Sequence, residues 1–299
     1  ANGKALQISR ASRWELKNGI IDGNRDNRGT AAQVPAHNVG IYDCDDFVVN
    51  RITSINARVD GFYLDEYTPG TASTSNYRGS FINCKTDNCT RQGCSVIGGH
   101  DIRFLHCSFI NTNGLSPGAG IDIEADVTTS QPSNTNILID GCYFNNNYGN
   151  AIQLSATRGA KDAIIQNCLL DGTNTEYTVS VTGVPTTTIN ASGHTFEDGM
   201  SVTFRTTNAL PTGISVGTGY FVVNSTSGTF EITTTPGGSG ITLTSSGTGT
   251  HTAGRGCETI RCDMPATITN NTFQNIISGR GTIDTGSGAL GKTIVSNNK

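Results

Sequence analysis

Three short stretches with one shared pattern decide the fold: Gly93-Cys-Ser-Val-Ile97, Gly120-Ile-Asp-Ile-Glu124 and Asn150-Ala-Ile-Gln-Leu154. In each, a turn residue precedes alternating residues, which is typical of a strand with one buried face. Further copies begin at Gly40, Gly61, Gly256 and Gly281. The first apolar positions of the earlier copies, 41, 62, 94, 121 and 152, are 21, 32, 27 and 31 residues apart. A repeat of this length predicts stacked coils.

A second type of strand lies between these copies. It occurs at Asp46-Phe-Val-Val-Asn50, Asp101-Ile-Arg-Phe-Leu105, Asn136-Ile-Leu-Ile-Asp140 and Ala163-Ile-Ile-Gln166. Two or three short strands per repeat cannot bury an apolar face alone, but stacked repeats can. The corners between the strands are rich in Asn and Gly, and Asn tolerates the left-handed backbone conformation that a tight corner needs. The sequence therefore predicts an all-β parallel solenoid.

The repeat is interrupted between Ile152 and Cys257, which are 105 residues apart. Within this gap, residues 176–254 contain no Cys, no Lys and only five charged residues, and they are rich in Thr, Gly and Ser. Without them, 26 residues remain, which is a normal repeat here. We expect a parallel β-helix over 1–175, a small inserted all-β domain over 176–254 and the continuation of the β-helix over 255–299.

Composition excludes several classes of partner. The 299 residues carry 20 Lys and Arg against 24 Asp and Glu, a net charge of −4, so no basic nucleic-acid-binding surface is expected. No run of 18 apolar residues indicates membrane insertion. The nine cysteines form no paired CxxC set of the kind that binds zinc. Because most lie among apolar neighbours, we expect buried free thiols from a reducing cytoplasm rather than a disulfide framework.

The sequence shows a family resemblance in the segment Gly19-Ile-Ile-Asp-Gly-Asn24, the strand Gly120–Glu124 and the recurring Cys-x-Phe of residues 107–109 and 142–144. It resembles right-handed parallel β-helix proteins of the pectate-lyase-like superfamily, above all bacteriophage tailspikes. The resemblance covers about 1–175 and 255–299. Residues 210–224, 229–233 and 247–252 of the insert are similar to a small β module of phage tail proteins. The resemblance implies a right-handed β-helix, a homotrimer, a bacterial surface polysaccharide as partner and often as substrate, and a phage virion tail or extracellular location.

The sequence departs from this family in two ways. It has no recognisable particle-attachment head, and it stops at Thr293–Lys299 without a C-terminal trimerisation domain. Either the chain is a fragment of a longer protein, or the expectation of a trimer weakens.

The alternation in Gly120–Glu124 predicts where its side chains point. Ile121 and Ile123 should point inward, and Asp122 and Glu124 should point outward with Cα atoms ~7 Å apart. The expected outward neighbours in successive coils are Tyr42, Tyr63, Ser95, Asp122 and Gln153, and beside them Asp65, Ile97, Glu124 and Ser155. Since coils stack ~4.8 Å apart, Asp65 and Glu124 should lie ~10 Å apart.

Paired carboxyls on one face are the equipment of a glycoside hydrolase, which needs one protonated acid and one base or nucleophile. The catalytic candidates are Asp122, Glu124 and Asp65, with Glu124 as the acid and Asp122 or Asp65 as the base. Candidate substrate-binding residues are Tyr42 and Tyr63, whose flat rings suit sugars, together with Gln153 and Arg158. The competing interpretation is that these acids are solvated surface groups.

Three other functions remain open from the residues alone. The same face would serve a glycan-binding module that does not cleave, or a purely structural tail component. A lyase or epimerase acting on uronic acids is the third, although that chemistry needs a cation, and few outward Lys or Arg are expected. No cofactor is expected. Asp60, Asp65, Glu66 and Asp126 are possible Ca²⁺ ligands, but they do not have EF-hand spacing, so no metal is expected.

Overall fold

The computed structural model describes residues 5–25, 36–65, 75–113, 115, 117–124, 134–155, 161–172, 176–216, 218–235, 237–255, 259–274, 283–285 and 293–299. Contacts divide the chain into two units. The first contains Ala1–Asp171, Glu258–Gln274 and Thr282–Lys299 and is a right-handed parallel β-helix; the second contains Gly172–Cys257 and Asn275–Gly281. No helix among the described residues is long and apolar enough to cross a membrane.

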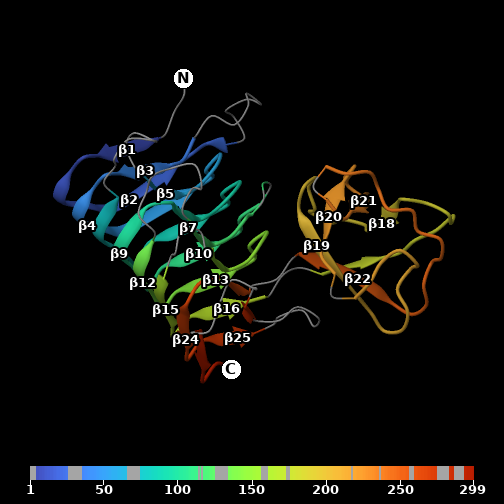
Figure 1. Cartoon of the computed structure of the whole chain (residues 1–299). Coiled ribbons are helices and arrows are strands. Elements are labelled where there is room, and N and C mark those ends of the chain that lie inside the picture. Colours follow the sequence, from blue (N-terminus) through green and yellow to red (C-terminus); the bar gives the residue numbers. More distant parts are fainter. Residues whose placement is uncertain are drawn as a thin grey trace. The chain divides into compact units, whose positions relative to one another are not determined.

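The first sheet of the β-helix, called sheet A here, takes one strand from each coil and is parallel throughout (Figure 1). Its strands are, in spatial order, β1 (Leu6–Ser9), β3 (Val39–Tyr42), β5 (Phe62–Asp65), β8 (Cys94–Val96), β11 (Ile121–Ile123), β14 (Ile152–Leu154), β23 (Ile260–Cys262) and β26 (Ile283–Thr285). Spatial order follows chain order, as stacked repeats require.

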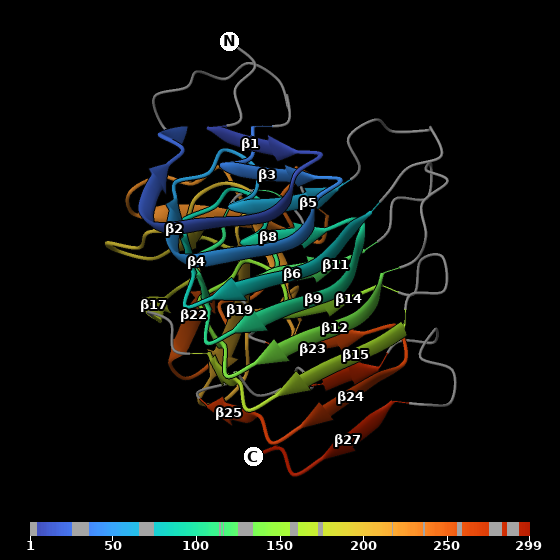
Figure 2. The same cartoon turned by 90° about the vertical axis from the view of Figure 1, so that its left-hand side faces the viewer.

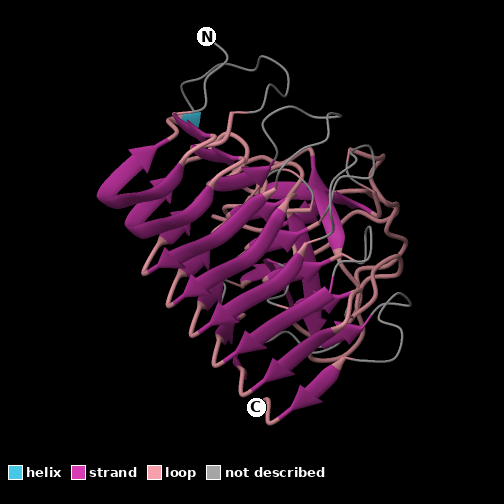
Figure 3. Ribbon diagram, turned by 60° about the vertical axis from the view of Figure 1, so that its left-hand side comes forward, coloured by secondary structure: helices cyan, strands magenta, loops and turns pink. Residues whose placement is uncertain are grey.

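The second sheet, sheet B, combines two series of strands (Figure 2, Figure 3). One series is β2 (Ser12–Asp22), β4 (Asp45–Ile55), β6 (Asn76–Ile82), β9 (Gly99–Leu105), β12 (Thr135–Asp140), β15 (Lys161–Gln166), β24 (Ala266–Thr269) and β27 (Ile294–Ser296). The other is β7 (Lys85–Asp87), β10 (Ser108–Ile110), β13 (Tyr143–Asn145), β16 (Leu169–Asp171) and β25 (Thr272–Gln274). The long strand β4 joins the two series, because it pairs with β6 through Asp45–Asn50 and with β7 through Thr53–Ile55.

Corners between the two series of sheet B adopt a positive φ in coil after coil. The residues are Asn83, His106, Gly141, Asn167, Asn270 and Asn297, with φ between 52° and 62°. A side chain normally disfavours this conformation, and Asn tolerates it better than most residues. The Asn-rich corners predicted from the sequence are therefore the points where the coil turns.

The core confirms the predicted direction of the β11 side chains. Ile121 and Ile123 have no exposed surface and belong to the apolar core of the β-helix. Aromatic side chains stack along the same core, with ring centroids 5.5 Å apart for Phe109 and Phe144. The eight described cysteines are free and buried, as expected.

The second unit has an antiparallel sheet of its own. In spatial order its strands are β17 (Tyr177–Val179), β22 (His251–Arg255), β19 (Ser201–Thr206), β20 (Tyr220–Val223), β21 (Thr229–Thr233) and β18 (Ile189–Asn190). Phe204 and Phe230 are fully buried in it. The expected insert limits, 176 and 254, lie within Gly172–Cys257.

Candidate functional site

The outer face of sheet A carries a column of residues that pair from coil to coil. Its members are Gly40, Tyr63, Ser95, Asp122, Gln153, Arg261 and Asp284. The predicted alignment of Tyr42 with Tyr63 is wrong by two residues, because Tyr42 pairs with Asp65. A strand alternates with period two, so a shift of two keeps every side chain on its expected face and leaves no trace in the pattern.

The coil after the insert also starts later than expected. Ile152 pairs with Ile260, not with Cys257, so Arg261 is the neighbour of Gln153 in this column. The side chain of Arg261 is 50% exposed and its Nε donates to Asp263 Oδ2 at 3.0 Å. Arg261 was not among the expected residues, because Ile260-Arg-Cys262 and the segment at Cys257 both start a short run of alternating residues. This face therefore holds one more cation than was expected.

A buried carboxylate lies at the turn before β5. Asp60 has no exposed surface and receives Arg91 Nε and Nη2 at 2.9 and 2.8 Å. It also receives the backbone N–H of Gln92 and the hydroxyl of Ser95, each at 3.1 Å, and His37 Nδ1 lies 3.0 Å from its Oδ2. Burial alone would raise the pKa of Asp60, but the hydrogen bond from His37 and the charge of Arg91 hold it below its ordinary value.

Asp122 is also fully buried, but its surroundings differ. Gln92 Nε2 donates to Asp122 Oδ2 at 2.7 Å, while Oδ1 is buried without a hydrogen-bond partner among the described residues. Burial, reinforced by the charge of Glu124, raises the pKa of Asp122 well above its ordinary value. The neutral, protonated form of the Asp122 carboxyl is therefore favoured to a higher pH than in an exposed aspartate.

Glu124 follows β11 and continues its ladder, since its backbone N–H donates to Val96 O at 3.0 Å. Its side chain is partly exposed. Asp65, also partly exposed, accepts a hydrogen bond of 2.9 Å from the hydroxyl of Tyr63. Of the three predicted catalytic carboxyls on the outer side of sheet A, one is thus buried and two are partly exposed.

The other candidate residues differ in accessibility. Tyr42 is buried, with 5% of its surface exposed. Tyr63 is partly exposed, and its ring stacks on that of His37 with centroids 3.9 Å apart. Gln153 is partly exposed and accepts a hydrogen bond from Asn150 Nδ2 at 3.3 Å. Arg158 lies outside the described residues, as do Glu66 and Asp126.

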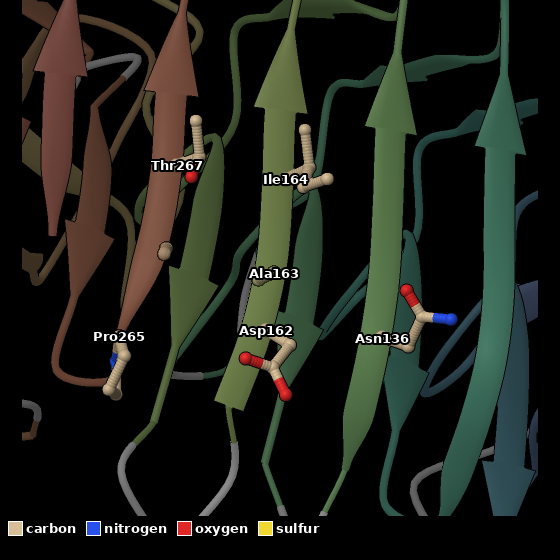
Figure 4. Close-up of a pocket in the computed structure, with 7 residues that line it drawn as sticks. Asn136, Asp162, Ala163, Ile164, Pro265 and Thr267 are labelled. Atoms are coloured by element: carbon tan, nitrogen blue, oxygen red, sulfur yellow. The ribbon is translucent and has the colours of Figure 1, made fainter. Parts of the chain in front are cut away.

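A shallow pocket of about 280 Å³ lies on the outer face of sheet B (Figure 4). It is lined by Asn136, Asp162, Ala163, Ile164, Pro265, Ala266 and Thr267. Asp162 is the single titratable group in this lining, so the pocket lacks a carboxyl pair. In the described part of the chain, no three His, Cys, Asp or Glu side chains are grouped to hold a metal ion.

Comparison with known proteins finds likeness in fold. No protein-family model and no curated protein sequence matches the chain. Among solved structures it is similar to the A-module of mannuronan C-5 epimerase AlgE6 from Azotobacter vinelandii, with 17% identity over 54% of this chain and 45% of that one, at a TM-score of 0.36. The chain thus spans less than half of that module.

Two tailspikes are also similar. One is gp49 from Acinetobacter baumannii bacteriophage Fri1, a capsular polysaccharide depolymerase, with 12% identity, coverage of 82% and 68%, and a TM-score of 0.32. The other is gp61 from Pseudomonas phage phi297, with 12% identity, coverage of 83% and 59%, and a TM-score of 0.23. The chain is a parallel β-helix protein similar to phage tailspikes.

Proposed function

We propose that the outer face of sheet A binds a bacterial surface polysaccharide and hydrolyses its glycosidic bonds, with Asp122 as the general acid and Glu124 as the base. The observation that carries this proposal is the enclosed carboxyl of Asp122, whose pKa burial raises, beside the partly exposed carboxyl of Glu124 directly after the same strand. Strongly perturbed acids of this kind are typical of catalytic sites.

The chemistry favours this assignment of roles over the one expected from the sequence. A general acid must carry its proton at the working pH, and the buried position of Asp122 favours that condition because it raises the pKa. Residues two apart on a strand have Cα atoms ~7 Å apart, a separation compatible with the ~6.5–9.5 Å between the carboxyls of inverting enzymes. Asp65, two coils away, serves substrate binding in this proposal.

The enclosure of Asp122 sets a condition on the proposal. Because Asp122 has no exposed surface, the bound sugar has to displace whatever covers its Oδ1 before proton transfer can occur. The same observation favours a second candidate function, a glycan-binding module in which Tyr63, Gln153 and Glu124 hold the sugar and Asp122 remains enclosed. The expected homotrimer and the phage-tail or extracellular location belong to the first proposal and are tested by sedimentation of the full chain and by fractionation of phage particles.

The test is release of new reducing ends from a panel of purified capsular and surface polysaccharides. Asp122→Asn and Glu124→Gln should each lower the rate at least about a hundredfold and leave binding intact. Asp284→Asn, an exposed change in the same column, is the matched control and should retain activity. Turnover equal to that of the wild type in both Asp122→Asn and Glu124→Gln would refute the site. Binding without products would select the binding module, and products absorbing as unsaturated uronates would select a lyase.

A further inference from the structure

Two buried aspartates at sheet A share one hydrogen-bonding group. Gln92 donates its backbone N–H to Asp60 Oδ1 and its side-chain amide to Asp122 Oδ2. Ser95, which pairs with Asp122 in the sheet, directs its hydroxyl to Asp60 Oδ2. Asp60 thus receives a full set of donors, whereas Asp122 receives one and keeps a bare oxygen.

Arg91 is the permanent cation of this cluster, and its orientation is fixed, while His37 Nδ1 contacts the same carboxylate from another side chain. Its guanidinium forks onto both oxygens of Asp60, a bidentate geometry that is stronger and more directional than a single contact. Its Nη2 also lies 3.4 Å from the hydroxyl of Ser95, the ladder neighbour of Asp122. Asp60 and Asp122 are the two carboxyls whose charges act on Arg91. If Asp60 lost its charge, Asp122 would be the remaining carboxyl of the two that could pair with the positive charge of Arg91.

We propose that Asp60 is a positioning residue that holds Arg91 away from Asp122 and thereby keeps Asp122 as a neutral acid. The groups that face Asp122 agree with this role. Glu124, directly after the same strand, and Asp60, from the turn before β5, favour the neutral form. Arg91 together with the amide of Gln92 opposes it. Ser95 and Gln153 flank Asp122 without charge.

Loss of the Asp60 charge has two effects on Asp122, and both favour its ionisation. It removes a negative charge that disfavours ionisation, and it frees a partly buried cation that favours ionisation. Asp122 would then ionise at lower pH and would be a weaker reservoir of the proton that a general acid has to supply. The catalytic meaning of this inference rests on the proposed function, but the protonation of Asp122 can be measured without a substrate.

The experiment compares unfolding of the full chain by urea across pH 4 to 9 in four proteins: wild type, Asp122→Asn, Asp60→Asn and the double variant. The stability difference caused by Asp122→Asn reports the titration of Asp122 in each background. We expect its midpoint to fall by at least one pH unit in the Asp60→Asn background, a tenfold change in the proton-binding constant. An unchanged or raised midpoint would overturn the proposal.

Asp60→Asn leaves Arg91 without its partner and can prevent folding. In that case Asp60→Asn combined with Arg91→Met is used, because it buries no unpaired charge. The two removed charges oppose each other at Asp122, so its midpoint should stay within half a pH unit of wild type, and a full unit of displacement would contradict the inference. If hydrolysis is found, the alkaline limb of its pH profile should move with the midpoint; if no hydrolysis is found, the unfolding data alone decide the role of Asp60.

Discussion

Replacing Asp122 by Asn should make the protein more stable at neutral pH, although it removes a fully buried hydrogen-bonded group. The amide has the same shape as the carboxyl, and its oxygen can still accept the hydrogen bond from Gln92 Nε2. It also cannot ionise. The pH-dependent part of the difference between the two proteins is therefore the cost of keeping an acid protonated in a folded site while the unfolded chain releases the proton.

The sign and size follow from proton linkage. In the unfolded chain Asp122 titrates near its ordinary pKa of 3.8, whereas burial and Glu124 raise the pKa in the folded protein. Between these two values the folded state binds one proton more than the unfolded state, so wild-type stability falls with pH by about 1.4 kcal/mol per pH unit. Below the unfolded value the contribution is fully present, and above the folded value it is lost and the curve levels off.

The assay is urea unfolding of wild type and Asp122→Asn at half-unit steps from pH 3 to 9, with fluorescence of the single tryptophan as the signal. The two proteins should differ least at pH 3, and the advantage of the variant should grow from about pH 4. Asp284→Asn controls for the loss of an exposed carboxylate on the same face. A pH-independent difference between wild type and Asp122→Asn, or an advantage that grows towards low pH, would show that Asp122 is not held protonated.

Three further changes test the packing of the β-helix and the turn geometry. Phe144→Ala removes a ring stacked on Phe109 and should cost about 3–5 kcal/mol in urea unfolding; a loss below 1 kcal/mol would show that the stack is not a packed core. Arg91→Ala leaves Asp60 as a buried carboxylate without its cation and should cost about 3–5 kcal/mol, a loss that should shrink when Asp60→Asn is added; additive effects would argue against their coupling. Asn83→Val places a branched side chain at φ 53° and should lower the free energy of unfolding, measured by thermal denaturation, by about 1–2 kcal/mol. Asn83→Gly should not lower it, and equal losses in the two variants would count against the turn conformation.

Much of the fold could be predicted because its determinants are local and repeated. The alternation around Ile121 and Ile123 indicates which side chains are buried, and the Asn corners indicate where the coil turns. Register is different. Tyr42 was aligned two residues from its true partner, because a shift of two retains the alternation and gives the same pattern of apolar residues. The coil after the insert was aligned on Cys257 instead of Ile260, because both positions start a short run of alternating residues. Only the hydrogen-bonded ladder distinguishes them.

The candidate site was predictable only in part. Asp122 and Glu124 could be placed on the outer face from the sequence, but the burial of Asp122 could not, because it depends on residues from other coils. The roles of Asp60 and Arg91 were missed for the same reason: they lie 31 residues apart and meet through the stacking of turns. Alternation along one strand predicts that a side chain points outward, but it does not predict whether residues of other coils bury that side chain.

The ladder across the second unit has a consequence for how such chains diversify. The strand before that unit and the strand after it are joined to their neighbours in unbroken order, with Ile152 beside Ile260 and Leu169 beside Thr272. The strand pairing of the β-helix therefore continues across the insertion point without a shift in register. The entropy of closing a loop also grows only slowly with the number of residues in it. Recombination at this junction could exchange one appended module for another, or delete it, without re-registering a single coil.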